Sequence, residues 1–388
     1  MTTETRKTDR TSKTSLLTTL KRAVYPVSST MIATATLVEG TLKGGNVPFR
    51  TLFVHHSSFN DHLAQRMYEG EPRVLRKWRI LIPRLKRMIQ QNRLEFDLCV
   101  AVLPFFYDRL LGELCDFKAY EEVRQVIDTS GGWEAMRQEF GKKKRQTTNN
   151  FSERFGLSYR ISKDVKDFDH FYHRMHVPHI RRRYGELSQI DSYEDMKSFF
   201  LKGLLLFVTK DDQPIAGALS LIEDKSIVFR RTGVLDGDES VVKGGAQTAL
   251  YYFQLKYAAD NGFRAVDAMK SAPYLNDGVF RHKAEWGACT LPDDEATRWV
   301  FFFGRGPNEK LAQFFDTNPI VATNATGLRG VVGHTQSNVA ATTVADDIQR
   351  RFHMKGLHDL RIYGPDGPKT VALAPPAAPP VQGGPRAV

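Results

Sequence analysis

Two adjacent glycines stand where a helix is expected to begin, an arrangement that suits a bound phosphate. Gly244 and Gly245 are followed by Gln247 within an amphipathic segment, 246–260. The first backbone N–H groups of a helix have no partner in the helix, and the helix dipole favours an anion there. A plain turn is the alternative for such a glycine pair. The pattern therefore suggests a phosphate or pyrophosphate at this helix start.

A second polar segment, 266–287, begins at the end of an expected strand at 265–268. It contains an acid, a hydroxyl, an amide and cations, namely Asp267, Ser271, Tyr274, Asn276, Arg281 and Lys283. Asp267 suits a residue that caps the next turn, and Asn276-Asp277-Gly278 suits a helix N-cap. Arg281 and Lys283 suit a solvated helix face. The residues by themselves leave structural and functional interpretations open.

In this order the two segments resemble the FemAB-like or CelD-like group of the GNAT acyltransferase superfamily. That group ends a strand in Asp, passes through a loop with Ser and Gly, and enters a helix with an aromatic residue, Lys and Gly. The upstream matches are Ile127-Asp128, Lys143-Lys144-Arg145, Asn149, Phe155-Gly156-Leu157, Phe171-Tyr172, Arg183 and Leu204–Leu219. The resemblance covers about 120–290 well and 30–110 loosely. One departure is His282, which stands where the family usually has Phe or Tyr.

The resemblance implies a reaction and a set of roles. GNAT folds splay two parallel strands so that an acyl-CoA, or an aminoacyl-tRNA 3′ end in the FemAB branch, lies in the gap. Carried over by position, Lys283 faces the donor's phosphates or the developing oxyanion, and Asp267 holds or deprotonates the attacking amine. The implied donor contacts are Gly244, Gly245, Gln247 and Arg281, and the implied substrate contacts are Ser271, Tyr274, Asn276 and Arg183.

The elements that must position these residues follow a mixed α/β pattern. Strands are predicted at 31–39, 49–55, 98–103, 204–209, 215–222, 227–232 and 265–268, with another ending at 128. Helices are predicted around Pro83, at about 133–154, 167–182, 192–202 and 246–260. The three strands from 204 to 232 predict an antiparallel meander, because turn residues separate them.

The resemblance implies two GNAT-like domains in tandem on mixed sheets, with a C-terminal segment that returns to the first domain. We expect disorder over 1–15 and an N-terminal domain over 16–125, completed by about 299–364. The C-terminal, catalytic domain is expected over 126–298. A Pro/Ala-rich disordered tail is expected over 365–388, where seven of the eighteen prolines lie.

Charge favours anionic partners. The chain has 55 basic and 44 acidic residues, a net charge of +11 and a pI of about 9.4. Such a balance suits nucleic acid, a phosphorylated cofactor or a membrane surface. Basic runs lie at 73–93, 142–145 and 181–183. Each suits a solvated helix face, and the sharper hypothesis is one ligand surface shared by all three.

Other features exclude whole classes of function. The longest apolar run, 98–107, is half the length of a bilayer span, and the first 25 residues lack a secretory core. Three scattered cysteines disfavour a disulfide framework or a zinc cluster. The histidines at 170, 173, 176 and 179 fan around a helix, so we expect no metal. These observations predict a cytoplasmic protein without a transmembrane segment.

The expected function is therefore an N-acyltransferase that moves an acyl group, acetyl in most such relatives, from acyl-CoA to an amine by direct attack. The first alternative is a FemAB-type aminoacyltransferase with aminoacyl-tRNA as donor, for which tRNA is a partner. The second is a non-catalytic basic RNA-binding protein on a GNAT scaffold.

Overall fold

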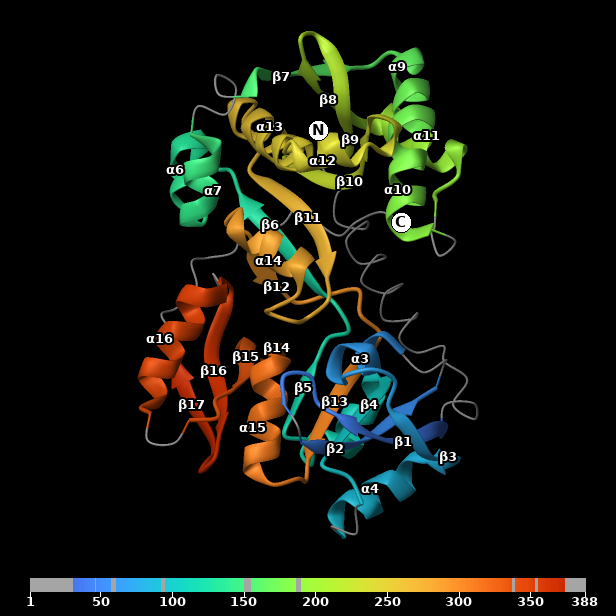
Figure 1. The fold of residues 1–388 in the computed structure, drawn as a ribbon, viewed down its shortest axis with the longest axis vertical. Helices are drawn as coiled ribbons and strands as arrows, with labels where there is room; N and C mark the ends of the chain where they lie inside the picture. The colour runs from blue at the N-terminus through green and yellow to red at the C-terminus, as the bar shows by residue number, and fades with distance from the viewer. Residues whose placement is uncertain are drawn as a thin grey trace, which may run out of the picture.

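The computed structural model places the chain in two mixed α/β units, which confirms the predicted fold class. The described residues are 31–45, 47–56, 61–91, 95–149, 155–185, 190–336, 339–352 and 355–373, with only the backbone of Asp61, His62 and Tyr184. The predicted disordered segment 1–15 lies outside them. Each unit is built on one mixed sheet, and the two units form a lower and an upper lobe (Figure 1). Among the described residues, no helix is long and apolar enough to cross a membrane.

The lower lobe contains a ten-stranded sheet that both ends of the described chain build. Its order is β17 (Gly367–Ala372), β16 (Leu357–Gly364), β15 (Gly327–Gly333), β14 (Ile320–Asn324), β5 (Phe117–Ala119), β13 (Arg298–Gly304), β4 (Leu98–Pro104), β2 (Pro48–His55), β1 (Ile32–Thr41) and β3 (Arg73–Leu81). The apolar strand β4 lies between β13 and β2, as a strand apolar on both faces should. Strands β13 to β17 thus return to the sheet that β1 to β5 begin.

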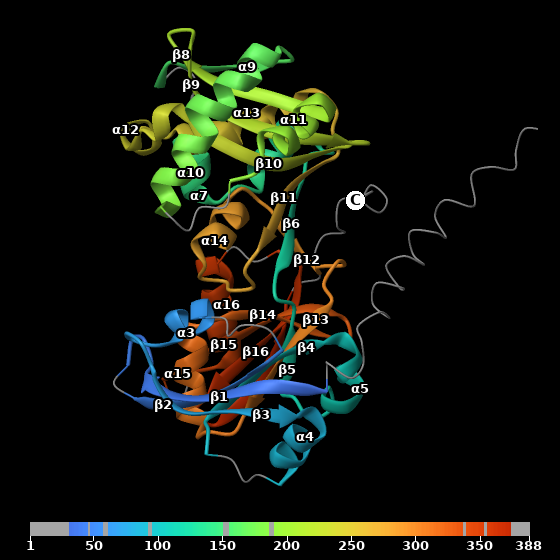
Figure 2. The ribbon, with the colours of Figure 1, turned by 90° about the vertical axis from the view of Figure 1, so that its right-hand side faces the viewer.

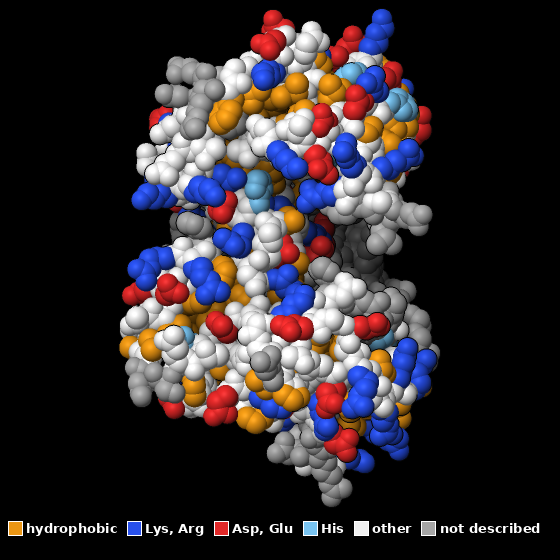
Figure 3. All heavy atoms as spheres, viewed as in Figure 1, with side chains coloured by type: hydrophobic (Ala, Val, Ile, Leu, Met, Phe, Trp, Pro, Cys, Tyr) orange, Lys and Arg blue, Asp and Glu red, His pale blue; other side chains and the backbone are white. Residues whose placement is uncertain are grey.

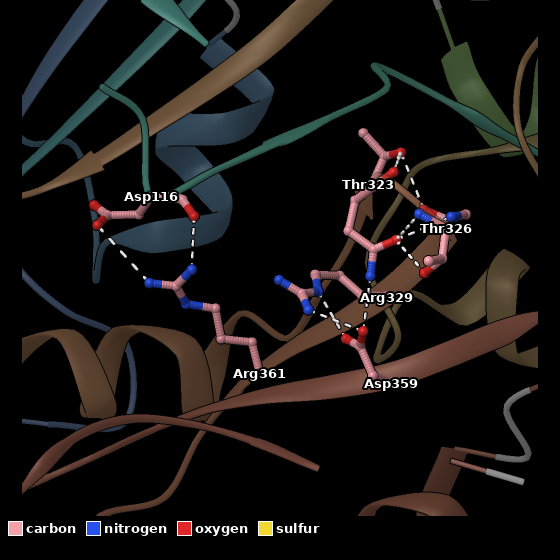
Figure 4. Close-up of polar contacts among 8 residues, drawn as sticks. Asp116, Thr323, Thr326, Arg329, Asp359 and Arg361 are labelled. Carbon is pink, nitrogen blue, oxygen red and sulfur yellow. Dashed lines mark hydrogen bonds and ion pairs between the residues drawn. The ribbon is translucent and has the colours of Figure 1, made fainter. Parts of the chain in front are cut away.

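Helices cover both faces of the lower sheet. The helices α3 (Asp61–Met67) and α15 (Asn308–Thr317) pack on one face, and α4 (Ile82–Gln90) and α5 (Asp108–Leu111) pack on the other. A further helix, α16 (Ala341–Phe352), packs on β14, β15 and β16. Polar contacts fix these last strands (Figure 4): Arg329 on β15 binds Asp359 on β16, and Arg361 donates to the Asp116 carbonyl at 2.8 Å.

The upper lobe contains a seven-stranded sheet. Its order is β12 (Cys289–Leu291), β6 (Val123–Asp128), β11 (Ala265–Ser271), β10 (Ser226–Val234), β9 (Gln213–Glu223), β8 (Gly203–Lys210) and β7 (Leu157–Ser162). The predicted meander is β8, β9 and β10. Its first turn contains Asp211 and Asp212, both with positive φ, as a two-residue hairpin turn requires. Figure 2 shows β6 and β11 running from this sheet toward the lower lobe.

Helices also cover both faces of the upper sheet. The helices α13 (Ala246–Asp260) and α6 (Gly132–Gln138) lie on one face. The other face carries α9 (Val165–His170), a π-helical segment (Phe171–His176), α10 (Val177–Tyr184) and α11 (Tyr193–Lys202). The short helices α12 (Glu239–Lys243) and α14 (Gly278–Glu285) precede α13 and follow β11.

Three predicted elements differ in kind from the structure. The long helix over 133–154 is wrong, because Gly141 is extended and separates α6 from α7 (Lys142–Thr148); residues 150–154 lie outside the described residues. The basic run at 73–93 is not one helix face, since Pro83 starts α4 and the preceding residues form β3. Gly367–Ala372, predicted as tail, form β17, because Gly364 and Gly367 close a hairpin with β16.

Candidate active site

The parallel strands β10 and β11 separate in the middle of the upper sheet. They pair over three residues, from Ser226 opposite Ala265 to Val228 opposite Asp267. Beyond that point β10 continues along β9 to Val234, whereas β11 bulges where it pairs with β6, between Asp267 and Lys270. This is the splayed parallel pair that the GNAT resemblance implies, and Asp267 lies at the point of separation.

Asp267 braces the bulge at the end of β11. The side chain is buried, and its Oδ1 accepts a hydrogen bond from the Met269 backbone N–H at 2.7 Å. Its Oδ2 lies 2.7 Å from the Arg124 guanidinium on β6. Met269 has a φ of 68°, a left-handed conformation that residues with side chains rarely adopt. Both carboxylate oxygens of Asp267 therefore hold the turn. This agrees with the interpretation of Asp267 as a residue that caps the turn after its strand.

Lys283 is buried, so the interpretation as a solvated helix face is wrong for it. Its Nζ donates to the carbonyl oxygens of Met269 at 3.2 Å and Lys270 at 2.9 Å, and to Ser271 Oγ at 2.9 Å. Burial lowers the pKa of Lys283 to about 8. An ammonium has three donors, and all three point at the bulge. Lys283 and Asp267 therefore hold the same turn from opposite sides.

Ser271 completes this buried network. Its hydroxyl donates to Gln125 Oε1 at 2.7 Å, and Gln125 Nε2 donates to the Phe280 carbonyl at 3.1 Å. Gln125 and Ser271 are 0% and 4% exposed. The predicted substrate contact Ser271 thus lies inside the packing between β6, β11 and α14.

His282 is connected to β10 through the ring of Tyr251. The ring of Tyr251 on α13 contacts Phe229, the first β10 residue past the paired segment, at 5.1 Å between centroids, and His282 at 4.7 Å. The indole N–H of Trp286 donates to His282 Nε2 at 3.3 Å. Because indole is only a donor, His282 Nε2 accepts and Nδ1 carries the proton. Burial, with help from Lys144, Lys283 and Arg183, lowers the pKa of His282 to about 4.

The start of α13 lies next to this histidine. Gln247 precedes Tyr251 by four residues and so shares its helix face. Gln247 Nε2 lies 3.3 Å from His179 Nε2 on α10, and Arg183 follows one turn later. Burial and the Arg183 charge lower the pKa of His179. The predicted donor contact Gln247 and substrate contact Arg183 are thus brought together.

Lys144 on α7 approaches from the other side. Its Nζ lies 5.1 Å from the centroid of the Trp286 ring and 3.8 Å from Glu285 Oε2. Burial lowers the pKa of Lys144. We refer to the residues around the gap as the His282 cluster: Lys144, His179, Arg183, Gln247, Tyr251, His282 and Trp286. Figure 3 shows Lys and Arg side chains gathered along the waist between the lobes.

The remaining predicted contacts do not join the His282 cluster. Tyr274 is buried beneath Arg66 of α3, whose guanidinium lies 4.1 Å from the ring centroid. Asn276 binds Arg66 and donates to the Thr317 carbonyl at 2.8 Å. Both residues therefore join the segment after β11 to the lower lobe. Arg281 is exposed on α14, and Asp277 caps α14 as the sequence suggests.

The basic runs do not share one surface. The runs at 142–145 and 181–183 contribute Lys144 and Arg183 to the His282 cluster. The described part of the first run, 73–91, lies in β3 at the edge of the lower sheet and in α4. The sequence marks His282 only as a departure from the family pattern and gives no signal for Tyr251. This departure is the feature of the sequence that could point to His282, because a titratable histidine replaces the usual Phe or Tyr there. Trp286 is expected in the core from its size and apolar ring, and it is fully buried there.

A separate hollow lies in the lower lobe, with a volume of about 390 Å³. Its lining includes Arg50, Asp97 and Lys310. The backbone N–H of Arg50 donates to Asp97 Oδ2 at 2.9 Å, and Lys310 Nζ lies 3.2 Å from the same oxygen. Asp97 thus binds both Arg50 and Lys310 within the lining, and none of the predicted site residues lines the pocket.

The chain is similar to known proteins in its structure but not in its sequence. The sequence matches no protein-family model and no curated protein sequence. Similar solved structures include FemX, at 11% identity and a TM-score of 0.36 over 72% of this chain and 86% of that one. The L-PGS of Bacillus licheniformis has 10% identity and a TM-score of 0.34 over 68% and 83%.

A GCN5-related N-acetyltransferase from Kribbella flavida has 10% identity and a TM-score of 0.25 over 80% of this chain and 71% of its own. At TM-scores below 0.5, these likenesses carry no conclusion about donor, acceptor or reaction.

Proposed function

We propose that the chain is a FemAB-like N-acyltransferase that moves an acyl group, acetyl in the first instance, from acyl-CoA to an amine. The observation that supports this most is the splay of β10 and β11 beside the His282 cluster. Where two strands part, backbone N–H and C=O groups on their facing sides need other partners. An extended acyl donor supplies such partners along its amide-bearing arm.

The donor's phosphates would lie at the start of α13. Gly245 has a φ of 95°, and a Cβ built there meets no atom within 4 Å, so a ligand can approach the backbone. The first turn of α13 contains no acid, and the N–H groups of its first three residues have no helical partner. Arg183 and Lys144 add positive charge nearby. A pyrophosphate suits this combination of donors and charge.

His282 would polarise the acyl carbonyl. With a pKa of about 4 the ring is neutral at pH 7, and Trp286 occupies Nε2, so Nδ1–H is the available donor. A neutral N–H held in place stabilises a developing oxyanion, as other preorganised donors do. The T-shaped contact with Tyr251 fixes the ring orientation. This role differs from the one that the resemblance implies, in which Lys283 faces the oxyanion.

For Lys283 and Asp267 we propose positioning roles. Their polar atoms hold Met269 and Ser271 at the end of β11. The bulge turns β11 away from β10 and keeps the gap open. They would therefore affect the reaction through the shape of the gap rather than through contact with the acyl group or the amine.

Aminoacyl-tRNA is the second candidate donor. The observation in its favour is that two basic runs, 142–145 and 181–183, both supply cations to the His282 cluster. A nucleic acid contributes many phosphates, and binding to it falls steeply with salt. If these cations bind RNA and the protein catalyses no acyl transfer, the protein is a binder of RNA.

Ligand-induced stabilisation tests the donor class. The melting temperature should rise with acetyl-CoA and with CoA, since a ligand at 100 times its Kd stabilises the folded state by about 2.7 kcal/mol. A rise with aminoacyl-tRNA alone would replace acyl-CoA by tRNA as donor. A rise with deacylated and aminoacylated tRNA alike, together with no turnover, would contradict the catalytic proposal.

Two substitutions at one position test the role of His282. His282→Phe removes the N–H and should lower kcat by about 100-fold, as loss of an oxyanion donor does. His282→Asn keeps an N–H in a similar place and should retain more activity. The acetyl-CoA shift in melting temperature should survive in both variants, which separates chemistry from binding. Equal turnover in the wild type and His282→Phe would show that His282 does not touch the reacting carbonyl.

A further inference from the structure

The outer edge of the lower sheet carries an unusual excess of positive charge. Between residues 73 and 91 the chain has seven basic residues and no acid. Arg73 lies 3.0 Å from Glu39. Within the described residues, none of the other six forms an ion pair; they are Arg76, Lys77, Arg79, Arg84, Lys86 and Arg87. We call these six residues and their two elements the β3–α4 surface.

The fold exposes this charge to solvent. Among the described residues, β3 is the last strand of the sheet and pairs with β1 alone, and none of them pairs with its outer edge. The helix α4 buries Ile82, Leu85 and Ile89 and directs Arg84 and Arg87 outward. Figure 2 shows β1, β3 and α4 together at the base of the lower lobe. Arg76 and Lys77 are successive residues of a strand and so point to opposite faces of the sheet. The cations therefore surround the outer edge of the sheet, on β3 and on the adjoining helix α4.

Exposed aliphatic side chains adjoin these cations. Ile32 on β1 lies opposite Leu81 on β3, and the two are 39% and 42% exposed. Met31 is 43% exposed, and its carbonyl accepts the Ile82 N–H at 3.1 Å. These three residues thus add exposed apolar surface where β3 meets α4, close in sequence to Arg79 and Arg84.

The mixture of aliphatic and basic side chains favours a lipid surface over RNA. Cations attract phosphates of either kind, but RNA bases stack on aromatic rings. The aromatic ring of this surface, Trp78, packs on the core beneath Arg76, 4.7 Å from its guanidinium. Aliphatic residues gain free energy by entering the acyl boundary of a bilayer, where basic neighbours face the headgroups.

We propose that the β3–α4 surface docks the protein on an anionic membrane surface. Met31, Ile32 and Leu81 enter the interface, and the six cations contact phosphate headgroups. The adjoining residues 1–30 carry six basic and two acidic side chains, so they match the sign of this surface rather than neutralise it. The proposal does not depend on which reaction the upper lobe performs.

Vesicle sedimentation with the full chain tests the proposal. The protein should bind vesicles of phosphatidylcholine with 30% phosphatidylglycerol, chosen as roughly a physiological share of anionic lipid, more tightly than pure phosphatidylcholine. Salt should weaken this binding. Arg79→Glu with Arg84→Glu should lower the partition coefficient by at least about 100-fold, since each cation near the surface contributes about fivefold. The matched control, Lys142→Glu with Lys143→Glu, makes the same charge change on exposed residues of the upper lobe and should bind nearly as the wild type does.

A third variant separates lipid from RNA. Leu81→Asn keeps every charge and should weaken vesicle binding about fivefold while leaving binding to a mixed-sequence single-stranded RNA unchanged. Melting temperatures verify that each variant is folded. The proposal is wrong if anionic and neutral vesicles bind equally, or if both double variants lose binding equally. It is also wrong if the charge reversal abolishes RNA binding in a protein that never binds vesicles.

Discussion

Both lobes contain parallel strand pairs among antiparallel neighbours, and the pair β2–β4 of the lower lobe differs from the pair β10–β11 of the upper lobe. In the lower lobe β2 and β4 stay paired over five residues, from Thr51 opposite Leu98 to His55 opposite Val102. In the upper lobe β10 and β11 part after three residues. Apolar side chains cover both faces of the closed pair. Buried polar side chains hold the end of the open pair.

The difference has a physical reason. A closed pair satisfies its backbone groups along the ladder, so apolar packing alone is enough to hold it. A bulge takes backbone groups out of the ladder, and buried N–H and C=O groups then need side-chain partners. Asp267 and Lys283 supply such partners at Met269 and Lys270. In this protein the open gap is thus accompanied by buried charged side chains that bind the backbone of β11, whereas apolar packing holds the closed pair.

The largest expected effect comes from removing that charge. Asp267→Ala leaves the Arg124 guanidinium and the Met269 N–H without their partner, so we expect a loss of about 3–5 kcal/mol in the free energy of unfolding. The control is Asp236→Asn, which removes an ion pair that is more than half exposed and keeps a residue type that tolerates the positive φ at this position, so the loss should be much smaller. Urea unfolding measures both. Equal small losses would show that the buried network does not hold the splay.

An apolar substitution in the closed pair should have a smaller effect and no functional consequence. Leu52→Ala on β2, 1% exposed, leaves a cavity and should lower the unfolding free energy by about 3 kcal/mol. The shift in melting temperature with acetyl-CoA should remain, whereas Asp267→Ala should abolish it. If Leu52→Ala weakens donor binding as much as Asp267→Ala does, the donor site is not confined to the open pair.

The smallest expected effect is the dependence of the unfolding free energy on pH, to which His282 makes a contribution that can be measured separately. Burial lowers its pKa from 6.5 to about 4 in the folded protein, so the unfolded chain binds more protons between these values. The contribution of His282 is complete above pH 6.5 and is lost as the pH falls toward 4. At pH 5 the loss relative to pH 7 should be about 2 kcal/mol. His282→Phe, measured beside the wild type, should remove this part of the slope, and parallel curves would contradict the buried, neutral ring.

Much of the fold could be predicted from the chain itself. The helix predicted at 246–260 is α13, and the meander is β8, β9 and β10. Local pattern fixes these elements, because apolar periodicity and turn residues act over a few positions. The long helix at 133–154 failed at Gly141, whose N–H donates to the Glu285 carbonyl at 2.8 Å. That contact lies far along the chain and leaves no local pattern.

In the candidate site, too, some of the predicted residues lie together and others do not. Gln247 and Arg183 were predicted and do meet at the His282 cluster. Tyr274 and Asn276 follow the bulge of β11 and instead contact the lower lobe through Arg66. The strand was predicted to end at 268 but continues to Ser271, with the bulge inside it. Because a bulge changes which face the following residues occupy, spacing from Asp267 could not place them.

The sequence by itself determined the mixed α/β pattern, the glycine-bearing start of α13 and the basic character of three runs. These properties depend on residue type and near neighbours, so they are legible along the chain. Only the tertiary structure decided that Lys283 and Asp267 face a backbone turn, that His282 is neutral, and that the run at 73–93 lies apart from the others. Burial and pairing depend on residues distant in sequence, as in the contact between Arg124 and Asp267 across 143 positions. The free energy of a charged side chain depends on those partners, because they set how much water it loses and what replaces it.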